Sequence, residues 1–367
     1  MDSKRDIKSK KYMEIYEDVR RDIIKGVYPT GRKIPSKRVM AESMGVSLIT
    51  VEHAYELLAE EGYILSKEKQ GYYVIFDENN SFGTNKDDLV VSKVKNTNVY
   101  EDQVEQSFYT ETISYNTFAK TTRHVLSEYN EELLLKSPGS GTVIFRQAIA
   151  NYLFRSRNIN VAYDQIIIGS GAEYLYGLIV QAWGRNVIYG IENPSYQKIS
   201  DIYNAGGVKL EKLSLGQDGI DSNFLWNSRA KVLHISPYRS YPSKITSSAS
   251  KKREYLRWCK EKDAIIIEDD VESEFTPSRK PEETLFSLDD DERVIYINTF
   301  TKTVGPFIRT AYMVIPRSMK PFLRERIGFY SCPVPTLDQY IIAELLNNGD
   351  FERHINRVRR NNRKNNK

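Results

Sequence analysis

The first 76 residues show two hydrophobic periodicities. From residue 12 to 23, apolar side chains recur every three or four positions and Gly26 follows them, which predicts a helix that ends at the glycine. Ser36 and Ser47 can each cap a further helix, the first over residues 37–44 and the second up to Gly62. Beyond Gly62, apolar and polar positions alternate on both sides of residues 67–71, which predicts a β-hairpin. The inward stripes are Tyr12, Ile15, Tyr16, Val19 and Ile23 in the first helix and Val51, Ala54, Tyr55 and Leu58 in the third.

The remaining chain has a different pattern. Residues 77–107 are polar, rich in Asn, Asp, Ser and Lys, and lack periodicity, so we expect an extended linker between a domain at 10–76 and a domain at 108–367. In the second domain short β-branched runs alternate with helical segments, which predicts an α/β fold with a largely parallel sheet and a site at the strands' carboxyl ends. Strands are expected at 165–168, 187–189, 231–235, 264–268, 294–297 and 311–315, and helices at 142–154, 173–183 and 251–261.

Composition excludes several classes of protein. The chain has 367 residues, more than one core holds, with 40% hydrophobic and 28% charged residues. No apolar run is long enough to span a bilayer, and the charged start, Met1–Lys11, lacks the apolar core of a secretory signal. Cys259 and Cys332 lie far apart without metal-ligand spacing. We therefore expect a cytoplasmic protein with no membrane association, no disulfide framework and no metal site.

The net charge of +4 comes from one segment. Residues 353–367 contain seven Lys or Arg and no acid, and without them the chain holds 46 basic and 49 acidic residues. The segment could be a helix, and a frayed, solvated end is a more common explanation of such a tail than a second DNA contact. DNA binding therefore has to be argued from local pattern rather than from overall charge.

Helix, turn, helix and hairpin together form an arrangement that reads DNA, with the third helix in the major groove. The alternative is a small helical protein-interaction domain with solvated charges. In the DNA-binding interpretation, the first turns of the second and third helices and the hairpin, or wing, supply the contacts to phosphates and base edges. The candidate residues are Lys37, Arg38, Ser47, Ile49, Thr50, His53, Lys69 and Gly71.

The residues of this domain match a family along their whole length. Gly26, Gly31, Pro35, Ser36 and Arg38 form the pattern G-x-x-x-x-G-x-x-x-P-S-x-R, followed by GVS, TV and AYELL-x-x-EG. The domain thus resembles the GntR-type winged helix-turn-helix, which implies binding to a double-stranded DNA operator. One departure is that Leu48 and Ile49 follow GVS, where the family usually has a DNA-contacting arginine. Apolar side chains there can touch thymine methyl groups, or alter or weaken recognition.

Three motifs in the second domain could carry chemistry. Gly169-Ser170-Gly171 lies between a strand and a helix, where it is either a phosphate cradle or a plain turn. Glu268-Asp269-Asp270 ends the most apolar strand, as catalytic or ligand-binding acids often do. Lys302, among small hydroxylated residues after another strand, could form a Schiff base, although most lysines are simply solvated.

In combination these motifs resemble the fold-type I pyridoxal-phosphate aminotransferases, and with the N-terminal reader they resemble the MocR subgroup of GntR regulators. The matching stretches are GSGAEYLYGLIVQAWG, IENPSYQKI, IIIEDDVESEF, NTFTKTVGPFIRTAYMVIP and GDFERHINRVRR. The resemblance implies that pyridoxal phosphate binds Lys302, with Asp269 at the ring nitrogen and Tyr196 on the ring. It implies a phosphate site formed by Ser170, Gly171, Ala172, Thr299 and Arg309.

Three departures from that family bear on function. Val271 stands where the family has a tyrosine on the cofactor's ring hydroxyl, and residues 237–244 lack the family's histidine, glutamine and final glycine. The family also continues beyond the position of Lys367, with a segment that carries the arginine for a substrate carboxylate, so the chain looks C-terminally shortened.

Three functions remain open from the sequence. The first is a homodimeric regulator in which pyridoxal phosphate on Lys302 acts as a sensor or structural ligand, with an amino-acid-like effector. The second is an active aminotransferase with an appended domain, which the departures disfavour, so transamination is not expected. The third is a regulator whose aminotransferase-like domain has lost the cofactor.

Overall fold

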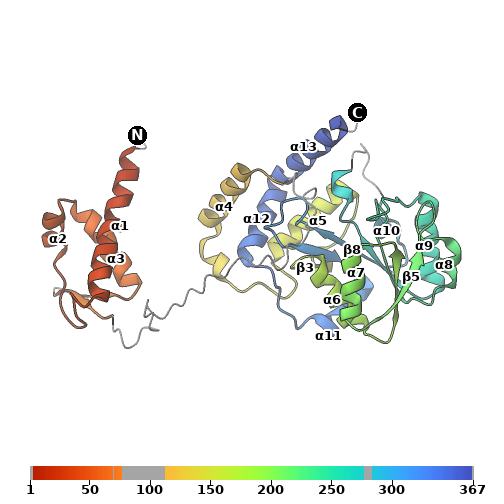
Figure 1. Ribbon diagram of the computed structural model, residues 1–367, viewed down its shortest axis with the longest axis horizontal. Helices are drawn as coiled ribbons and strands as arrows, with labels where there is room; N and C mark the ends of the chain where they lie inside the picture. The colour runs from red at the N-terminus through yellow and green to blue at the C-terminus, as the bar shows by residue number, and fades with distance from the viewer. Residues whose placement is uncertain (1–2, 69, 77–111, 277–282, 366–367) are drawn as a thin grey trace, which may run out of the picture. The chain divides into compact units, whose positions relative to one another are not determined.

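The computed structural model describes residues 3–68, 70–76, 112–276 and 283–365 (Figure 1). The chain divides into two compact units, residues 1–100 and 101–367, and each has its own hydrophobic core. The predicted linker at 77–107 lies outside the described residues. No helix in the described ranges combines the length and the apolar character that crossing a membrane requires.

The first unit contains three helices and a two-stranded antiparallel sheet. The helices are α1 (Ser3–Ile24), α2 (Lys37–Met44) and α3 (Leu48–Glu60), and the strands are β1 (Ile64–Lys67) and β2 (Gly71–Val74). The side chains of Val51, Ala54, Tyr55 and Leu58 on α3 are fully buried against α1. The apolar stripes of the sequence thus form the core of the unit, and the opposite face of α3 remains in solvent.

Serine caps fix the starts of α2 and α3. The hydroxyl of Ser36 accepts the amide proton of Val39, and that of Ser47 accepts the amide proton of Thr50. Each cap satisfies an amide that has no partner within its helix. Gly45, at a φ of +62°, ends α2 and lets the chain turn into α3.

The second unit is a seven-stranded sheet covered by helices on both faces (Figure 1). The strand order is β3-β9-β8-β7-β6-β4-β5, and only β9 runs against the others. The strands are β3 (Ile166–Gly169), β4 (Ile188–Asn193), β5 (Lys209–Ser214), β6 (Val232–Ile235), β7 (Ile265–Asp269), β8 (Val294–Thr299) and β9 (Ala311–Val314). The sequence pattern did not predict β5, which lies at one edge of the sheet.

The helices of this unit pack into cores on both sides of the sheet. One core joins α5 and α12 to the sheet, a second joins α6 and α7, and a third lies under α9. The helices are α4 (Tyr115–Tyr129), α5 (Val143–Arg157), α6 (Ala172–Trp183), α7 (Gln197–Ala205), α8 (Ser222–Asn227), α9 (Ala249–Glu261), α10 (Leu285–Leu288), α11 (Lys320–Ile327), α12 (Thr336–Asn347) and α13 (Asp350–Asn365). Short 3-10 helices are η2 (Asn130–Leu134), η3 (Tyr163–Gln165), η4 (Ser273–Phe275) and η5 (Arg317–Met319).

Residues 353–365 of the basic segment lie in a helix, one of the two forms considered for it, and are not a frayed end. They form most of α13, which buries Phe351, His354, Ile355 and Val358 against the rest of the unit. A frayed end was considered because the arginines between the apolar residues make the helical spacing of those apolar residues hard to recognise in the sequence.

Candidate functional site

The candidate cofactor residues lie at the end of the sheet where the parallel strands reach their carboxyl termini. Gly169 at the end of β3 and Thr299 at the end of β8 pair with Ala311 from opposite sides. Asp269 ends β7 and pairs with Ile297 of β8. Lys302 lies in the turn that follows β8. The lysine, the acid and the Gly-Ser-Gly turn therefore all lie at the carboxyl end of the parallel strands.

Asp269 is buried, with one of its carboxylate oxygens engaged and the other alone. Its Oδ2 accepts a hydrogen bond from the phenol of Tyr176 on α6 and lies 3.4 Å from Nε2 of His234 on β6. Its Oδ1 is buried and has no hydrogen-bond partner among the described residues. A buried polar atom without a partner costs about 1–3 kcal/mol, so Oδ1 would be stabilised by a donor on a bound molecule.

Two tyrosines and a histidine support this carboxylate. The hydroxyl of Tyr203 lies 2.8 Å from Nδ1 of His234, and when it donates there, Nε2 holds the imidazole proton and points it toward Asp269. Burial raises the pKa of Tyr176 and of Tyr203 well above the ordinary value, so both phenols remain protonated donors. The sequence motifs did not indicate any of these three residues, because each lies in an ordinary-looking helix or strand.

Lys302 forms an ion pair with a neighbouring acid. Its Nζ donates to Oε1 of Glu272, and the two side chains are 17% and 26% exposed. The amine is therefore accessible from solvent but held by an opposite charge. Glu272 directly follows Val271, the residue that replaces the family's tyrosine.

The Gly-Ser-Gly turn leads into the N-terminus of α6, where backbone amides favour an anion. Gly171 has a φ of +98°, and a Cβ placed on it would lie 3.1 Å from Nη2 of Arg309. The guanidinium therefore approaches the backbone closely at Gly171, between Ser170 and Ala172. Arg309 also lies 3.6 Å from the carboxylate of Glu173.

Thr299 and Tyr196 have contacts of their own apart from the other candidate cofactor residues. The hydroxyl of Thr299 donates to the carbonyl of Thr310 at 3.1 Å and accepts the amide of Thr301 at 3.2 Å. It is thus already engaged within the lysine turn. Tyr196 precedes α7 at the end of β4 and is 41% exposed, and its ring contacts the edge of Tyr241.

A buried acid supports the neighbouring loop. Oε2 of Glu192 on β4 accepts the amide of Ser236 at 3.1 Å and the hydroxyl of Ser240 at 2.7 Å. Burial raises the pKa of Glu192 to about 7. Ser240 lies where the family has glutamine, and its hydrogen bond to Glu192 holds this loop to β4.

Some candidate DNA contacts of the first unit are exposed, although the ring of His53 also contacts that of Tyr12 at 6.2 Å between centroids, and others are held by neighbouring residues. Arg38, Ile49 and His53 are exposed, and Ile49 is 65% exposed on the first turn of α3. Lys37 is paired with Glu52, which reduces its charge toward a phosphate. The hydroxyl of Ser47 lies 2.7 Å from that of Thr50, so this pair belongs to the cap of α3.

The wing residues differ in how they are placed. Gly71 has a φ of +102°, and a Cβ on it would lie 2.9 Å from Cε of Lys33, so the hairpin needs a glycine there. Lys67 places its ammonium 4.6 Å from the ring centre of Tyr73. Lys69, the predicted wing cation, lies outside the described residues.

The donor set fits pyridoxal phosphate in part. An amine, a buried carboxylate with one unpartnered oxygen, and an arginine at a helix N-terminus match the aldehyde, ring nitrogen and phosphate of that molecule. A partner for the ring hydroxyl is missing at Val271, and the hydroxyl of Thr299 is engaged elsewhere.

Comparison with known proteins identifies both units. Residues 11–74 match the family of bacterial regulatory proteins called gntR, and residues 112–366 match aminotransferase class I and II. The uncharacterized HTH-type transcriptional regulator YdeL of Bacillus subtilis is 28% identical, over 95% of this chain and 76% of its own length. The probable rhizopine catabolism regulatory protein MocR of Rhizobium meliloti is 24% identical, over 95% and 74%.

Solved structures share the fold of the second unit. A multiple substrate aminotransferase from Thermococcus profundus superposes with a TM-score of 0.63 at 22% identity, over 69% of this chain. The chain spans 65% of the length of that enzyme. Through its second unit the chain belongs to the aminotransferase class I and II family, with a gntR-type helix-turn-helix domain before it, and its relatives along nearly the whole chain are named as regulators.

Proposed function

We propose that this protein is a DNA-binding transcription regulator whose aminotransferase-like domain holds pyridoxal phosphate on Lys302 as a sensor or structural ligand. The reader domain supports the DNA-binding part, because the first turn of α3 exposes Ile49 and His53 to solvent. A regulator that binds the chromosome acts in the same compartment, which for this family is the cytoplasm.

The observation that carries the cofactor assignment is the single unpartnered oxygen of Asp269. A protonated ring nitrogen would donate to Oδ1 while Tyr176 and His234 keep Oδ2 occupied. Pyridoxal phosphate supplies an electron-withdrawing ring when it is bound. The residues of this chain bind its aldehyde at Lys302, orient its ring at Asp269, and hold its phosphate at Gly171 and Arg309.

The absorbance spectrum of the full chain with pyridoxal phosphate tests this assignment. We expect a near-visible band in the wild type that is lost in Lys302→Ala and weakened in Asp269→Ala. Arg229→Ala, which removes an exposed charge from the same domain, is the control and retains the band. If neither wild type nor variant shows a band, the cofactor part of the proposal fails and the DNA-binding part is left to stand on its own.

The engaged residues keep a cofactor-free regulator as a second candidate. Lys302 is paired with Glu272, and the hydroxyl of Thr299 already has two partners. Such a protein would bind operator DNA with the same affinity whether or not pyridoxal phosphate is added. An active aminotransferase would instead convert amino acids in the presence of a 2-oxo acid, which we do not expect with Val271 in the ring-hydroxyl position.

We further propose a homodimer that responds to an amino-acid-like effector. Leu134, Leu135 and Phe329 are 86%, 67% and 75% exposed, and a partner subunit that covered them would remove this apolar surface from water. A symmetric dimer would present two reader domains to paired half-sites. Light scattering at micromolar concentration should give twice the chain mass, and Leu134→Glu combined with Phe329→Glu should give the monomer.

A further inference from the structure

The helix α13 has one buried face and one strongly basic face. Phe351, Ile355 and Val358 are buried against the body of the second unit. The opposite stripe contains Arg353, Arg357, Arg360 and Lys364, all exposed and spaced four, three and four residues apart. No acidic residue lies between Arg353 and Lys364 in the sequence. A stripe with this spacing stays on one side of a helix.

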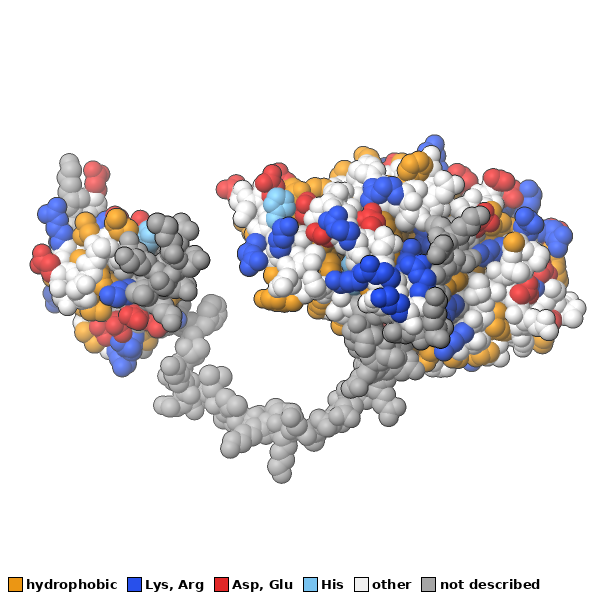
Figure 2. All heavy atoms as spheres, turned by 90° about the horizontal axis from the view of Figure 1, so that it is seen from above, with side chains coloured by type: hydrophobic (Ala, Val, Ile, Leu, Met, Phe, Trp, Pro, Cys, Tyr) orange, Lys and Arg blue, Asp and Glu red, His pale blue; other side chains and the backbone are white. Residues whose placement is uncertain are grey.

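The basic surface continues onto a neighbouring helix. Lys120 and Arg123 are exposed on α4, one turn apart. Figure 2 shows Lys and Arg side chains gathered in a band over α4 and α13 on one face of the second unit. We call this band, formed by Lys120, Arg123 and the α13 stripe, the basic face.

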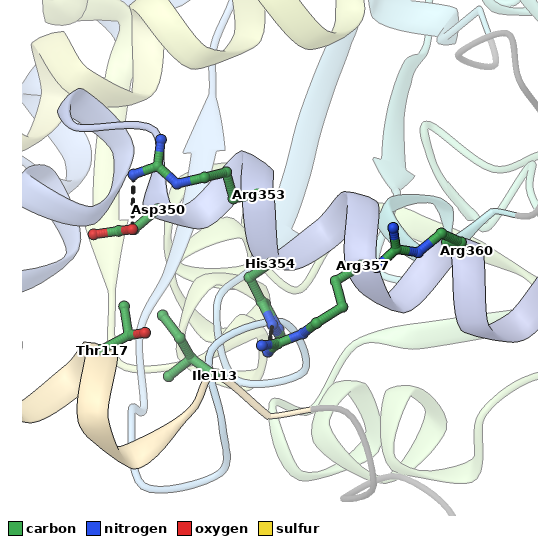
Figure 3. A pocket seen from close by; sticks show the side chains of 7 residues that line it. All are labelled: Ile113, Thr117, Asp350, Arg353, His354, Arg357 and Arg360. Carbon is green, nitrogen blue, oxygen red and sulfur yellow. Dashed lines mark hydrogen bonds and ion pairs between the residues drawn. The ribbon is translucent and has the colours of Figure 1, made fainter.

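A cavity of about 360 Å³ lies within the basic face, between the start of α4 and α13 (Figure 3). Arg353, Arg357 and Arg360 line it from α13, and Thr117 lines it from the first turn of α4. The hydroxyl of Ser114 already caps the amide of Thr117 at the start of α4, so what favours an anion at this end is the positive end of the helix dipole. Asp350 pairs with Arg353 at 2.7 Å, which leaves Arg357 and Arg360 as the cations that an incoming anion meets.

We propose that the basic face is a second, sequence-independent DNA contact that binds the phosphate backbone of duplex DNA. The proposal rests on the DNA-binding function above and adds a contact from the aminotransferase-like domain. Arg357, Arg360 and Lys364 rise about 4.5 and 6 Å from one to the next along the helix, a spacing of the same order as the 3.4 Å rise per phosphate of a DNA strand. The cavity then accommodates one phosphate at the start of α4.

The side chains of the basic face favour a nucleic acid over a membrane. Between and beside the cations, the exposed positions of α13 are asparagines, such as Asn356 and Asn361. A helix that lies on a lipid surface needs exposed apolar side chains to insert, and this face has none within α13. An extended row of guanidinium and ammonium groups suits a backbone of regularly spaced phosphates.

The test varies residues that do not contribute to the fold of α13. Arg357 is unsuitable, because it donates to Nδ1 of His354, whose Nε2 lies 2.8 Å from the carbonyl of Thr303 in the lysine turn. Arg360 and Lys364 are exposed, and alanine maintains helix propensity at both positions. The matched control is Arg229→Ala with Arg253→Ala, which removes two exposed charges elsewhere in the same domain.

The full chain is titrated with a 30-base-pair duplex of random sequence over a range of salt concentrations. Loss of two phosphate contacts should make the slope of log affinity against log salt shallower by about 1.8 in Arg360→Ala/Lys364→Ala. The control should keep the wild-type slope, as should Arg360→Lys/Lys364→Arg, which preserves the charges. Circular dichroism should show the same helix content in all four proteins.

The possible outcomes separate this inference from the proposed function. If the wild type binds the duplex and the alanine double variant keeps its slope, or changes no more than the control, the second contact is refuted while the regulator stands. If the wild type binds no duplex at any salt, the DNA-binding function itself fails. If the double variant loses binding to phosphatidylserine vesicles while its duplex slope is unchanged, the basic face is a lipid site and the proposal is overturned.

Discussion

The phenol of Tyr176 donates a hydrogen bond to one oxygen of Asp269, while the other oxygen of that carboxylate is buried with no partner in the described part of the chain. The two residues come from α6 and β7, on elements that the sheet brings together. Tyr176 thereby fixes the orientation of the carboxylate without using Oδ1. Oδ1 of Asp269 is therefore left to accept a hydrogen bond from one further donor.

Replacement of Tyr176 by phenylalanine tests that arrangement. The ring remains to pack against His234, whose ring centre lies 4.8 Å away, but the hydrogen bond to Asp269 is lost. We expect pyridoxal phosphate to bind about 5- to 30-fold more weakly, equal to about 1–2 kcal/mol, because the carboxylate can rotate. Absorbance titration measures this change. Tyr189→Phe is the control, since its hydroxyl contacts only the carbonyl of Gly184 among the bonds described. Equal effects of the two variants would contradict the role of Tyr176.

Gly171 and Gly184 allow backbone strain to be separated from a clash with Arg309. They flank α6 at φ values of +98° and +82°, with ψ values of 162° and 175°, so alanine strains both by about 1–3 kcal/mol. Only at Gly171 does the new methyl group meet the guanidinium, whereas nothing lies within 4 Å at Gly184. We expect both variants to lose similar stability, but only Gly171→Ala to bind pyridoxal phosphate at least about tenfold more weakly. Equilibrium dialysis would show the difference, and unchanged binding in Gly171→Ala would remove Arg309 from the phosphate site.

The buried acid Glu192 predicts a dependence of stability on pH. Its pKa is about 7 in the folded chain, against an ordinary value of 4.5, because burial disfavours the charged form. The folded state therefore holds the proton more tightly than the unfolded state does. The resulting stabilisation is fully present below about pH 4.5 and is lost as the pH rises through about 7.

Glu192→Gln removes this titration but can keep both hydrogen bonds at one amide oxygen. The stability of the wild type relative to Glu192→Gln should fall by about 3 kcal/mol between pH 4.5 and pH 8. Urea unfolding at the two pH values measures the difference. Glu128→Gln, at an exposed position on α4, should show no such change. Parallel pH profiles for wild type and Glu192→Gln would disprove the assignment.

A substitution at Ile49 on α3 tests the contribution of this side chain to DNA affinity separately from its contribution to stability. Ile49 is 65% exposed, so Ile49→Ala should change the free energy of unfolding by less than about 0.5 kcal/mol. If its side chain contacts thymine methyl groups, affinity should fall by about five- to tenfold. The probe is the duplex that the wild-type protein selects from a random pool, measured by fluorescence anisotropy. Ile24→Ala, at the 41% exposed end of α1, is the matched control. An unchanged affinity in Ile49→Ala would exclude this contact.

Much of the fold follows from local patterns in the sequence. The range predicted for α2, 37–44, agrees with the structure, because a serine cap and a glycine stop mark its ends. The strand β5 was missed, because its edge position leaves Lys209, Glu211 and Lys212 outside the core and makes the segment look like a polar loop. For the segment of α13 the sequence left a helix and a solvated tail open, because the buried stripe is interrupted by arginines.

The candidate site was only partly predictable, for a different reason. Lys302, Asp269 and Gly171 lie in recognisable motifs at strand ends, and their shared edge follows from the alternation of strands and helices. The partners of Asp269 cannot be found from such motifs, because Tyr176 lies 93 residues and His234 lies 35 residues from Asp269 along the chain. Neither has a local signal, since a buried aromatic residue in a helix or strand usually indicates only packing.

The reversed strand β9 separates the two ends of the candidate site. Because Ala311 pairs with Gly169 on one side and with Thr299 on the other, the backbones of Gly169 and Thr299, which lead into the Gly-Ser-Gly turn and the lysine turn, are two strand spacings, or about 9.5 Å, apart. This distance is set by backbone hydrogen bonds rather than by side chains. A ligand bound at both Gly171 and Lys302 would therefore have to bridge the turns that follow two strands with β9 between them, and the backbone pairing of the sheet keeps those strands at a fixed separation.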